Sequence, residues 1–332
     1  MPRLRTVSTR DPGWTRVRHG RGHRYLDVDG TPLGPEEVAR VKALVIPPAW
    51  RDVWISPHPN AHLQAVGTDE AGRRQYLYHP YWRQKRDEAK FDRVLEMAVK
   101  LPRVRERLRQ DLSGWERVDL TTALSAAVRL VDLGCFRLGS EASAETNGAY
   151  GLTTLERRHV TRDGEGRVFC FVGKSGIEHC ITLTDPLMTA VVDAMAGRRR
   201  SDARLLSAKV GNRWVAVQPG QINDHIRELF DLEVTAKDFR TWHATVHVAM
   251  AVASAEPVTS KRARTKVVRE AIVGASELLG NTPTVCRSSY VNPQVIDLYE
   301  SDTTIAEALK RLDQDQDRAR DQVDQAVVEL LS

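Results

Sequence analysis

Five side chains in this sequence could together transfer a phosphodiester, with a tyrosine as nucleophile and four cations around the phosphate. The tyrosine is Tyr290, and the cations are Arg137, Lys174, Lys237 and Arg240. A planar guanidinium donates two parallel hydrogen bonds to two phosphate oxygens, so arginine suits the binding of the reacting group. Lysine suits a leaving group, because its pKa can fall far enough to release a proton.

The segments around these residues make the set informative. Singly, an arginine near a helix end is usually an ion-pair partner, a lysine in a turn is usually solvated, and a loop tyrosine is usually a half-buried anchor. Here Lys237 precedes Arg240 by three residues, and Asn281 precedes Tyr290 by nine. The order and spacing of the whole set therefore favour a catalytic group.

Signatures of several other enzyme classes are absent from the sequence. It has no GxxxxGK[ST] loop, no GxGxxG after a strand and no GxSxG elbow. No compact cluster of Asp and Glu indicates a two-metal nuclease, and no CxxC or HExxH pattern indicates zinc. We therefore expect no bound nucleotide, no metal and no other cofactor.

Several motifs of the chain resemble those of the type IB DNA topoisomerases, in the short poxvirus-like form found in bacteria. The resemblance covers nearly the whole length, and its most specific pieces are Phe136-Arg137-Leu138-Gly139, Phe171-Val172-Gly173-Lys174, Lys237-Asp238-Phe239-Arg240-Thr241-Trp242 and Leu279-Gly280-Asn281-Thr282-Pro283 with Tyr290. Tyrosine recombinases share the catalytic fold, but they carry an HxxR box where this chain has Lys237 and Arg240. Because the catalytic fold is shared, a recombinase is the nearest alternative, although its HxxR box differs from the KxxR of this chain.

The resemblance implies a role for each residue. Tyr290 would form a 3′-phosphotyrosyl bond, Arg137 and Arg240 would bind the non-bridging oxygens, Lys174 would protonate the leaving 5′-oxygen, and Lys237 would assist. It also implies relaxation of supercoiled duplex DNA without ATP or metal, by a monomer whose two lobes form a C-shaped clamp.

Asn281 departs from the family pattern, because most members have histidine at this position. An amide can donate a hydrogen bond to a phosphate oxygen but cannot carry charge or shuttle a proton. We expect Asn281 to bind the transition state only. An architectural DNA-binding protein with a decayed site is an alternative of another class, and Tyr299 is the first alternative nucleophile.

Charge is unevenly distributed along the 332 residues, which carry a net +5. Residues 301–332 carry a net −4, which leaves +9 for residues 1–300. Arginine and lysine cluster at 16–24, 103–109, 198–200 and 261–269. Such stripes attract polyanions by counterion release. No secretory signal and no long apolar run is present, so a cytoplasmic, nucleoid-associated protein that avoids membranes is expected.

Residues 1–90 predict a small β-rich domain that binds DNA. Strands are expected at 24–28, 61–68 and 73–78, and a helix at 35–44. The segment Arg74-Gln75-Tyr76-Leu77-Tyr78 resembles the family strand that reads bases in the major groove. Alternation along it puts Tyr76 and Tyr78 on one face and Gln75 on the other. The alternative is a strand whose tyrosines belong to the core.

Residues 91–332 predict a larger, mainly helical catalytic domain, so the fold class is α+β. Helical periodicity starts near residue 90, a β-hairpin is expected at 167–183, and a basic helix capped by Thr259 or Ser260 runs to Leu279. Residues 305–330 predict one acidic helix, which is expected to pack on the body rather than bind a partner. The cysteines are expected to be free thiols: Cys135, Cys170, Cys180 and Cys286.

Overall fold

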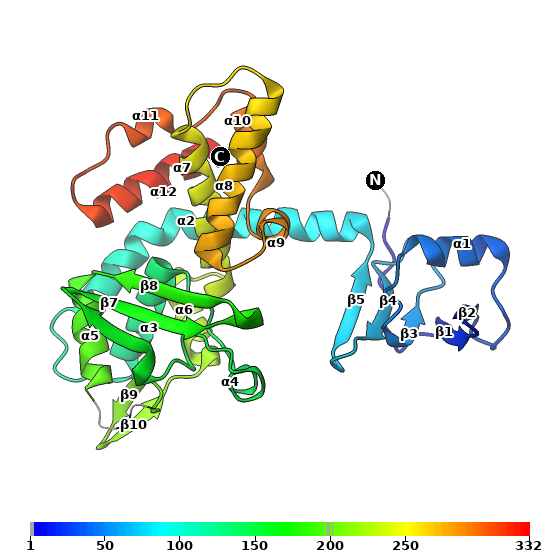
Figure 1. Ribbon diagram of the computed structural model, residues 1–332, viewed down its shortest axis with the longest axis horizontal. Coiled ribbons are helices and arrows are strands. Elements are labelled where there is room, and N and C mark those ends of the chain that lie inside the picture. The colour runs from blue at the N-terminus through cyan, green and yellow to red at the C-terminus, as the bar shows by residue number, and fades with distance from the viewer. Residues whose placement is uncertain (1–2, 198–199, 201) are drawn as a thin grey trace. The chain divides into compact units, whose positions relative to one another are not determined.

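The computed structural model describes residues 3–197, 200 and 202–332, and the chain divides into two compact units, Met1–Lys90 and Phe91–Ser332 (Figure 1). Arg198 and Arg199 of the predicted basic cluster lie outside the described residues. The first unit is mainly β and the second mainly helical, so the α+β prediction is confirmed. Within the described ranges, no helix has the length and apolar character needed to cross a membrane.

The N-terminal unit is an antiparallel sheet of five strands in the order β2-β1-β3-β4-β5, with one helix. The elements are β1 (Trp14–His19), β2 (Gly22–Leu26), α1 (Pro35–Ala43), β3 (Arg51–Ile55), β4 (Leu63–Thr68) and β5 (Arg74–Tyr78). Val41 of α1 is buried in one cluster with Trp14 and Ile55 of the sheet. The helix and the three strands predicted here are confirmed to within two residues.

The second unit arranges its helices around one core. They are α2 (Pro80–Leu112), α3 (Leu120–Gly134), α4 (Glu141–Asn147), α5 (Pro186–Ala196), α6 (Pro219–Phe230), α7 (Ala236–Ala253), α8 (Lys261–Leu279), α9 (Pro283–Ser289), α10 (Pro293–Glu300), α11 (Ala306–Leu309) and α12 (Gln316–Leu331). Ser260 caps α8 and Gly280 ends it in the left-handed region, as predicted. Helix α2 begins ten residues earlier than expected. Residues 83–88 are all polar, so apolar periodicity starts only at Phe91.

A three-stranded sheet, in the order β6-β7-β8, lies against the helices of this unit. Its strands are β6 (Val160–Asp163), β7 (Gly166–Val172) and β8 (Glu178–Leu183), and a separate hairpin pairs β9 (Ser207–Val210) with β10 (Arg213–Ala216). The predicted hairpin at 167–183 is confirmed as β7 and β8. The sequence patterns missed β6, β9 and β10, which are only four residues long each.

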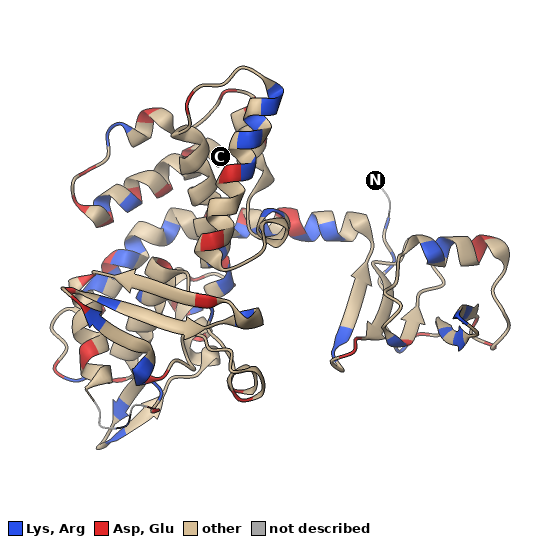
Figure 2. Ribbon diagram, in the orientation of Figure 1, with Lys and Arg blue, Asp and Glu red and all other residues tan. Residues whose placement is uncertain are grey.

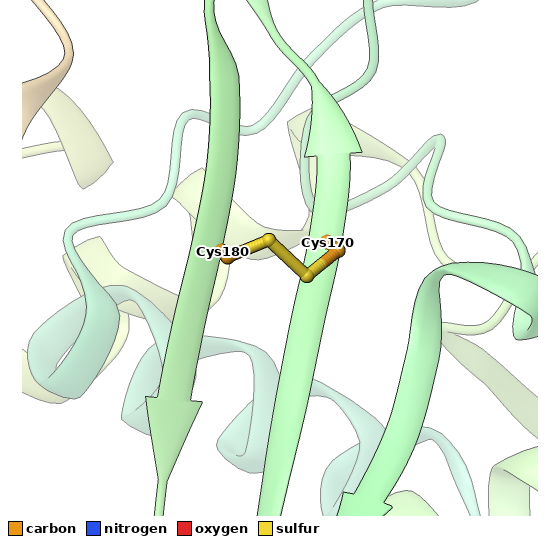
Figure 3. Close-up of a disulfide and its surroundings, with 2 residues drawn as sticks. All are labelled: Cys170 and Cys180. Atoms are coloured by element: carbon orange, nitrogen blue, oxygen red, sulfur yellow. A yellow bond between two sulfur atoms is a disulfide. The ribbon is translucent and has the colours of Figure 1, made fainter.

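Cys170 and Cys180 form a disulfide, so the expectation of free thiols is wrong for this pair (Figure 3). The register of β7 and β8 puts the two residues directly opposite each other, with Cα atoms 4.2 Å apart. That closeness depends on the position of the turn at 173–177, which ten residues of spacing do not specify. Cys135 and Cys286 are free and buried.

The acidic tail packs back on the helical body, as expected, but it is not one helix. Residues 310–315 separate α11 from α12, and Asp315 caps α12 by accepting a hydrogen bond from the Arg318 N–H at 2.9 Å. Val323, Val327 and Leu331 of α12 are buried in the main core. Figure 1 shows α12 beside α7.

Aspartates of this tail pair with buried arginines of α2 and α3. We call this group the tail network; its members are Arg105, Arg129, Asp132, Asp185, Asp317, Asp321 and Asp324. Arg105 lies 2.9 Å from Asp132, 2.6 Å from Asp321 and 2.7 Å from Asp324. Both arginines are almost fully buried, so each needs carboxylates around it.

Candidate active site

Arg137 lies on a loop that starts where α3 ends. Cys135 closes the helix in the left-handed region, and its N–H donates to the Val131 carbonyl at 3.1 Å. The loop is then fixed by a later segment of the same chain, because the Leu152 N–H donates to the Arg137 carbonyl at 2.8 Å. Gly139 has a φ of +84°, and a Cβ there would meet Gly151 at 2.9 Å. The glycine therefore permits the close crossing that holds Arg137 in place.

Arg240 is buried in α7 and joins the ends of two other helices. Its Nη2 donates to the Leu279 carbonyl at the end of α8, at 2.7 Å. Its Nη1 donates to the Cys135 carbonyl at the end of α3. The last carbonyls of a helix have no partner within it, so the guanidinium binds the negative ends of both helices.

Arg137 reaches the turn that follows α8. Its Nη2 donates to Asn281 Oδ1 at 2.6 Å and to the Gly280 carbonyl at 3.2 Å. The other end of the same amide, Asn281 Nδ2, is buried and has no hydrogen-bond partner among the residues that the structure describes. A buried donor without a partner is costly, and it is the group that an incoming phosphate oxygen would satisfy.

Tyr290 lies directly after α9, and its backbone is held on both sides. Its N–H donates to the Cys286 carbonyl at 2.9 Å, and its carbonyl accepts from Thr245 Oγ1 at 3.3 Å. The side chain is 8% exposed, and the centre of its ring lies 5.6 Å from Arg240 Cζ. The phenol is therefore presented from a rigid support beside one of the two arginines.

Positive charge dominates around Tyr290. Burial raises the pKa of the phenol, but Arg240, Arg137 and Lys237 together outweigh burial, so the pKa lies below its ordinary value. Burial, followed by repulsion from Arg137, lowers the pKa of Arg240. Neither arginine has a carboxylate partner among the described residues. A phosphodiester is the kind of anion that such a site would bind.

A pocket of about 330 Å³ opens beside these groups. Arg137, Lys237, Arg240 and Tyr290 all contribute to its wall. Lys237 is exposed in the first turn of α7. The structure therefore brings together these four residues, with Asn281 bonded to Arg137.

Lys174 is more loosely connected to this group. It is exposed at the tip of the β7–β8 hairpin, whose turn includes Ser175 at a φ of +65°. Gly173, the residue before it, lines a very small cavity together with Arg137 and Arg240. The start of the hairpin turn therefore lies at the site, and the lysine that follows it extends into solvent.

The tyrosines of β5 are surface residues, so the alternative of a core strand is wrong. Tyr76 and Tyr78 are 47% and 38% exposed, and their rings stack with centres 6.2 Å apart. Gln75 points to the other face, where its Nε2 donates to Asp69 at 2.9 Å. The two tyrosines offer an apolar platform with polar tips on the N-terminal unit.

Several positions that build the site escaped the sequence patterns. Thr245 bonds the Tyr290 carbonyl, and the carbonyls of Cys135 and Leu279 hold Arg240. Backbone acceptors leave no signal in residue type. Tyr299 lies elsewhere, with its ring 5.7 Å from Arg264 Cζ. In the described part of the chain, no group of three or more His, Cys, Asp or Glu is placed to hold a metal ion.

Two protein-family models match this chain. The catalytic core of eukaryotic DNA topoisomerase I matches residues 79–317, and the N-terminal domain of bacterial DNA topoisomerase IB matches residues 22–69.

Curated relatives are similar over most of the chain. DNA topoisomerase 1B of Acanthamoeba polyphaga mimivirus is 27% identical over 272 residues, which are 80% of this chain and 81% of the relative. DNA topoisomerase 1 of Rabbit fibroma virus (strain Kasza) is 22% identical over 77% of this chain and 78% of the relative. DNA topoisomerase I of Monkeypox virus is 24% identical, with coverage of 70% and 71%.

Proposed function

We propose a mechanism for a chain that belongs to the type IB DNA topoisomerases, and is therefore an isomerase acting on DNA: Tyr290 cleaves and rejoins one strand of the duplex. The phenol oxygen forms a bond to phosphorus, the bond to the 5′-oxygen breaks, and a 3′-phosphotyrosyl intermediate results. The phenol loses its proton, and the leaving 5′-oxygen gains one. Religation is the reverse reaction after the nicked duplex has rotated.

One observation carries this proposal: Arg137 and Arg240 converge beside Tyr290, and their hydrogen-bond partners among the described residues are all neutral. Their hydrogen bonds go to three carbonyls and one amide oxygen, so both positive charges remain available for a non-bridging phosphate oxygen. Such donors stabilise the charge of the transition state without having to reorganise.

The remaining polar groups complete the assignment. Asn281 Nδ2 supplies a neutral hydrogen bond to the phosphate, and Lys237 adds charge at the rim of the pocket. Lys174 protonates the 5′-oxygen, with its long side chain reaching toward bound DNA from the exposed hairpin tip.

The energetics fit this division of labour. A free phenol with a pKa near 10 is ionised about once in a thousand molecules at pH 7, which corresponds to roughly 4 kcal/mol. The arginines offset part of that cost by lowering the pKa of Tyr290. One phosphodiester replaces another, so the exchange is close to energy-neutral, and we propose that it requires neither ATP nor a metal ion. The strain of supercoiling drives relaxation.

The N-terminal unit would bind the duplex away from the cut. Tyr76 and Tyr78 are available to contact bases or phosphates, while Gln75 would exchange its bond to Asp69 for a contact to adenine. Basic residues of α8, seen along its N-terminal half in Figure 2, would contact phosphates. Action of the chain as a monomer belongs to the same proposal, and the clamp that the resemblance implies stays a prediction.

The decisive experiment traps the intermediate. The full chain is mixed with a supercoiled plasmid that lacks recombination sites, in EDTA and without ATP, and is then denatured. Relaxation and a covalent 3′-adduct that maps to Tyr290 are expected.

Two substitutions make the test specific. Tyr290→Phe should abolish the adduct and relaxation while DNA binding persists, and Tyr299→Phe should retain both activities. An adduct that persists in Tyr290→Phe would refute the assignment of the nucleophile. Absence of relaxation at any salt concentration would favour a recombinase or an architectural protein.

A further inference from the structure

His179 is a residue of the site that the mechanism above does not use. It lies on β8 directly opposite Phe171 of β7, and the two rings stack with centres 5.2 Å apart at 21°. Cys170 and Cys180, one register position away, point to the opposite, exposed face of the same hairpin. His179 therefore belongs to the inner face, and the hairpin that carries it also carries Lys174.

The imidazole lies against two glycines that belong to separate parts of the site. A methyl group added at Gly173 would lie 2.7 Å from both Cδ2 and Nε2 of the ring. One added at Gly280 would lie closer still, against Cε1. Gly173 immediately precedes Lys174, and Gly280 immediately precedes Asn281. The ring thus fills the space between the start of the hairpin turn and the turn after α8.

No hydrogen bond joins residues 173–178 to residues 279–282 in the described part of the chain. Each segment is internally fixed instead. The Gly173 N–H donates to the Ile177 carbonyl at 2.7 Å, and the Gly280 carbonyl accepts from Arg137. The imidazole therefore makes a packing contact that connects the two segments.

The ring is also suited to this place by its charge. Burial lowers the pKa of His179, and the positive charges of Arg137 and Arg240 lower it further, which favours the neutral ring. A neutral imidazole at this place does not compete with the two arginines for the phosphate. A lysine or arginine at position 179 would add a third competing cation.

We propose that His179 is a positioning residue that seats the Lys174 hairpin against the turn bearing Asn281, so that the acid for the leaving group and the donors for the phosphate stay in register. This inference rests on the proposed function, because it takes Lys174 as that acid. Displacement of a reacting group by about 1 Å costs on the order of 100-fold in rate. Loss of the imidazole should therefore slow the step that Lys174 performs, which is protonation of the leaving 5′-oxygen.

The test compares two substrates under single-turnover conditions, one of which has sulfur in place of the 5′-oxygen at the cut. A thiol has a pKa near 8.5, so its thiolate leaves without protonation and needs no acid. His179→Ala should slow cleavage of the ordinary substrate by roughly 10- to 100-fold. With the sulfur substrate it should cleave within about threefold of the unaltered chain.

Three variants calibrate this result. Lys174→Ala should also be rescued by sulfur, whereas Arg137→Ala should not. His247→Ala is the matched control, because His247 is likewise partly buried and lies 2.6 Å from the Cβ that Gly274 would carry, at the α7–α8 contact. Its ratio of sulfur to oxygen rates should equal that of the unaltered chain.

A second pair of variants keeps the inference testable if His179→Ala proves unstable. Gly173→Ala should push the hairpin away from the ring and slow cleavage of the ordinary substrate. The double variant Gly173→Ala/His179→Ala removes the clash, so it should be no slower than the worse single variant.

The inference is overturned if His179→Ala cleaves the ordinary substrate at full rate, or if sulfur rescues Lys174→Ala but not His179→Ala. It is also overturned if the two defects of the double variant multiply. If sulfur fails to rescue Lys174→Ala itself, the proposed role of Lys174 is wrong instead.

Discussion

Two groups of buried or partly buried arginines lie in the helical unit, and they differ in what surrounds them. In the tail network, Arg105 and Arg129 contact carboxylates at 2.6–2.9 Å. In the candidate active site, Arg137 and Arg240 donate to carbonyls and one amide, and neither has a carboxylate partner among the described residues. The same side chain is therefore neutralised in one place and left with its charge available in the other.

The pKa directions express this difference. For Arg105, burial lowers the pKa, but Asp132 and Asp324 outweigh burial and raise it well above its ordinary value. For Arg240, burial and Arg137 together lower the pKa. A paired arginine stabilises the fold, whereas an unpaired one stores an unfavourable interaction that an anion can relieve. Such a contrast can separate structural from functional arginines in one chain.

The largest effect expected is on stability, from Arg105→Met. Removal of one partner leaves Asp132 and Asp324 buried with too little positive charge, so the free energy of unfolding should fall by about 3–5 kcal/mol. Urea unfolding of the full chain measures it. Arg107→Met on the same helix is the control, because Arg107 is 63% exposed in its pair with Asp111, and the pair should contribute less than about 1 kcal/mol. Equal losses in the two variants would contradict the comparison.

Arg240→Gln should instead act mainly on rate. Removal of one charged donor from the phosphate site should slow single-turnover cleavage by roughly 100- to 1000-fold. The loss of stability should stay below that of Arg105→Met, because repulsion from Arg137 is relieved. Arg93→Gln is the control. Arg93 is a partly exposed partner of Asp238, which lies on the same helix as Arg240, and its loss should leave the cleavage rate within a few-fold. A drop in stability without a drop in rate would place Arg240 with the tail network.

The pH dependence of stability should follow the tail network. Burial raises the pKa of Asp132, but Arg105, Arg320 and His243 outweigh it and hold that pKa well below the ordinary value. A depressed pKa means that stability is present above the unfolded value, near 4, and is lost as pH falls through the folded value. Thermal melting between pH 6 and pH 3 should show a steep decline for the unaltered chain and a shallower one for Asp132→Asn. Parallel melting curves for the two chains would show that Asp132 does not cause this pH dependence.

The smallest effect is expected from Asn281→His. If Asn281 acts only by hydrogen bonding, an imidazole can replace it, and the cleavage rate should stay within about tenfold or rise. Asn281→Asp sharpens the comparison, because it places a carboxylate against Arg137 and makes that arginine resemble Arg105. It should lose more activity than Asn281→His. A folded but inactive Asn281→His variant would count against its place beside the phosphate.

Local sequence rules determined much of the architecture. A capping serine and a terminal glycine were enough to bound α8 at Ser260 and Gly280, and alternation along β5 gave the faces of Tyr76 and Tyr78. These rules work because each involves residues only a few positions apart. The motifs also identified the family and the candidate residues, whose catalytic roles stay predictions.

Only the tertiary structure decided which charges meet. Arg105 and Asp321 are 216 residues apart, so no spacing rule could show that the acidic tail neutralises buried arginines. The disulfide between Cys170 and Cys180 depended on the register of one turn, and the place of His179 on the packing of two glycines. Arg137 and Arg240 are ordinary arginines in the sequence. The fold makes them a candidate phosphate site by surrounding them with carbonyls in place of carboxylates.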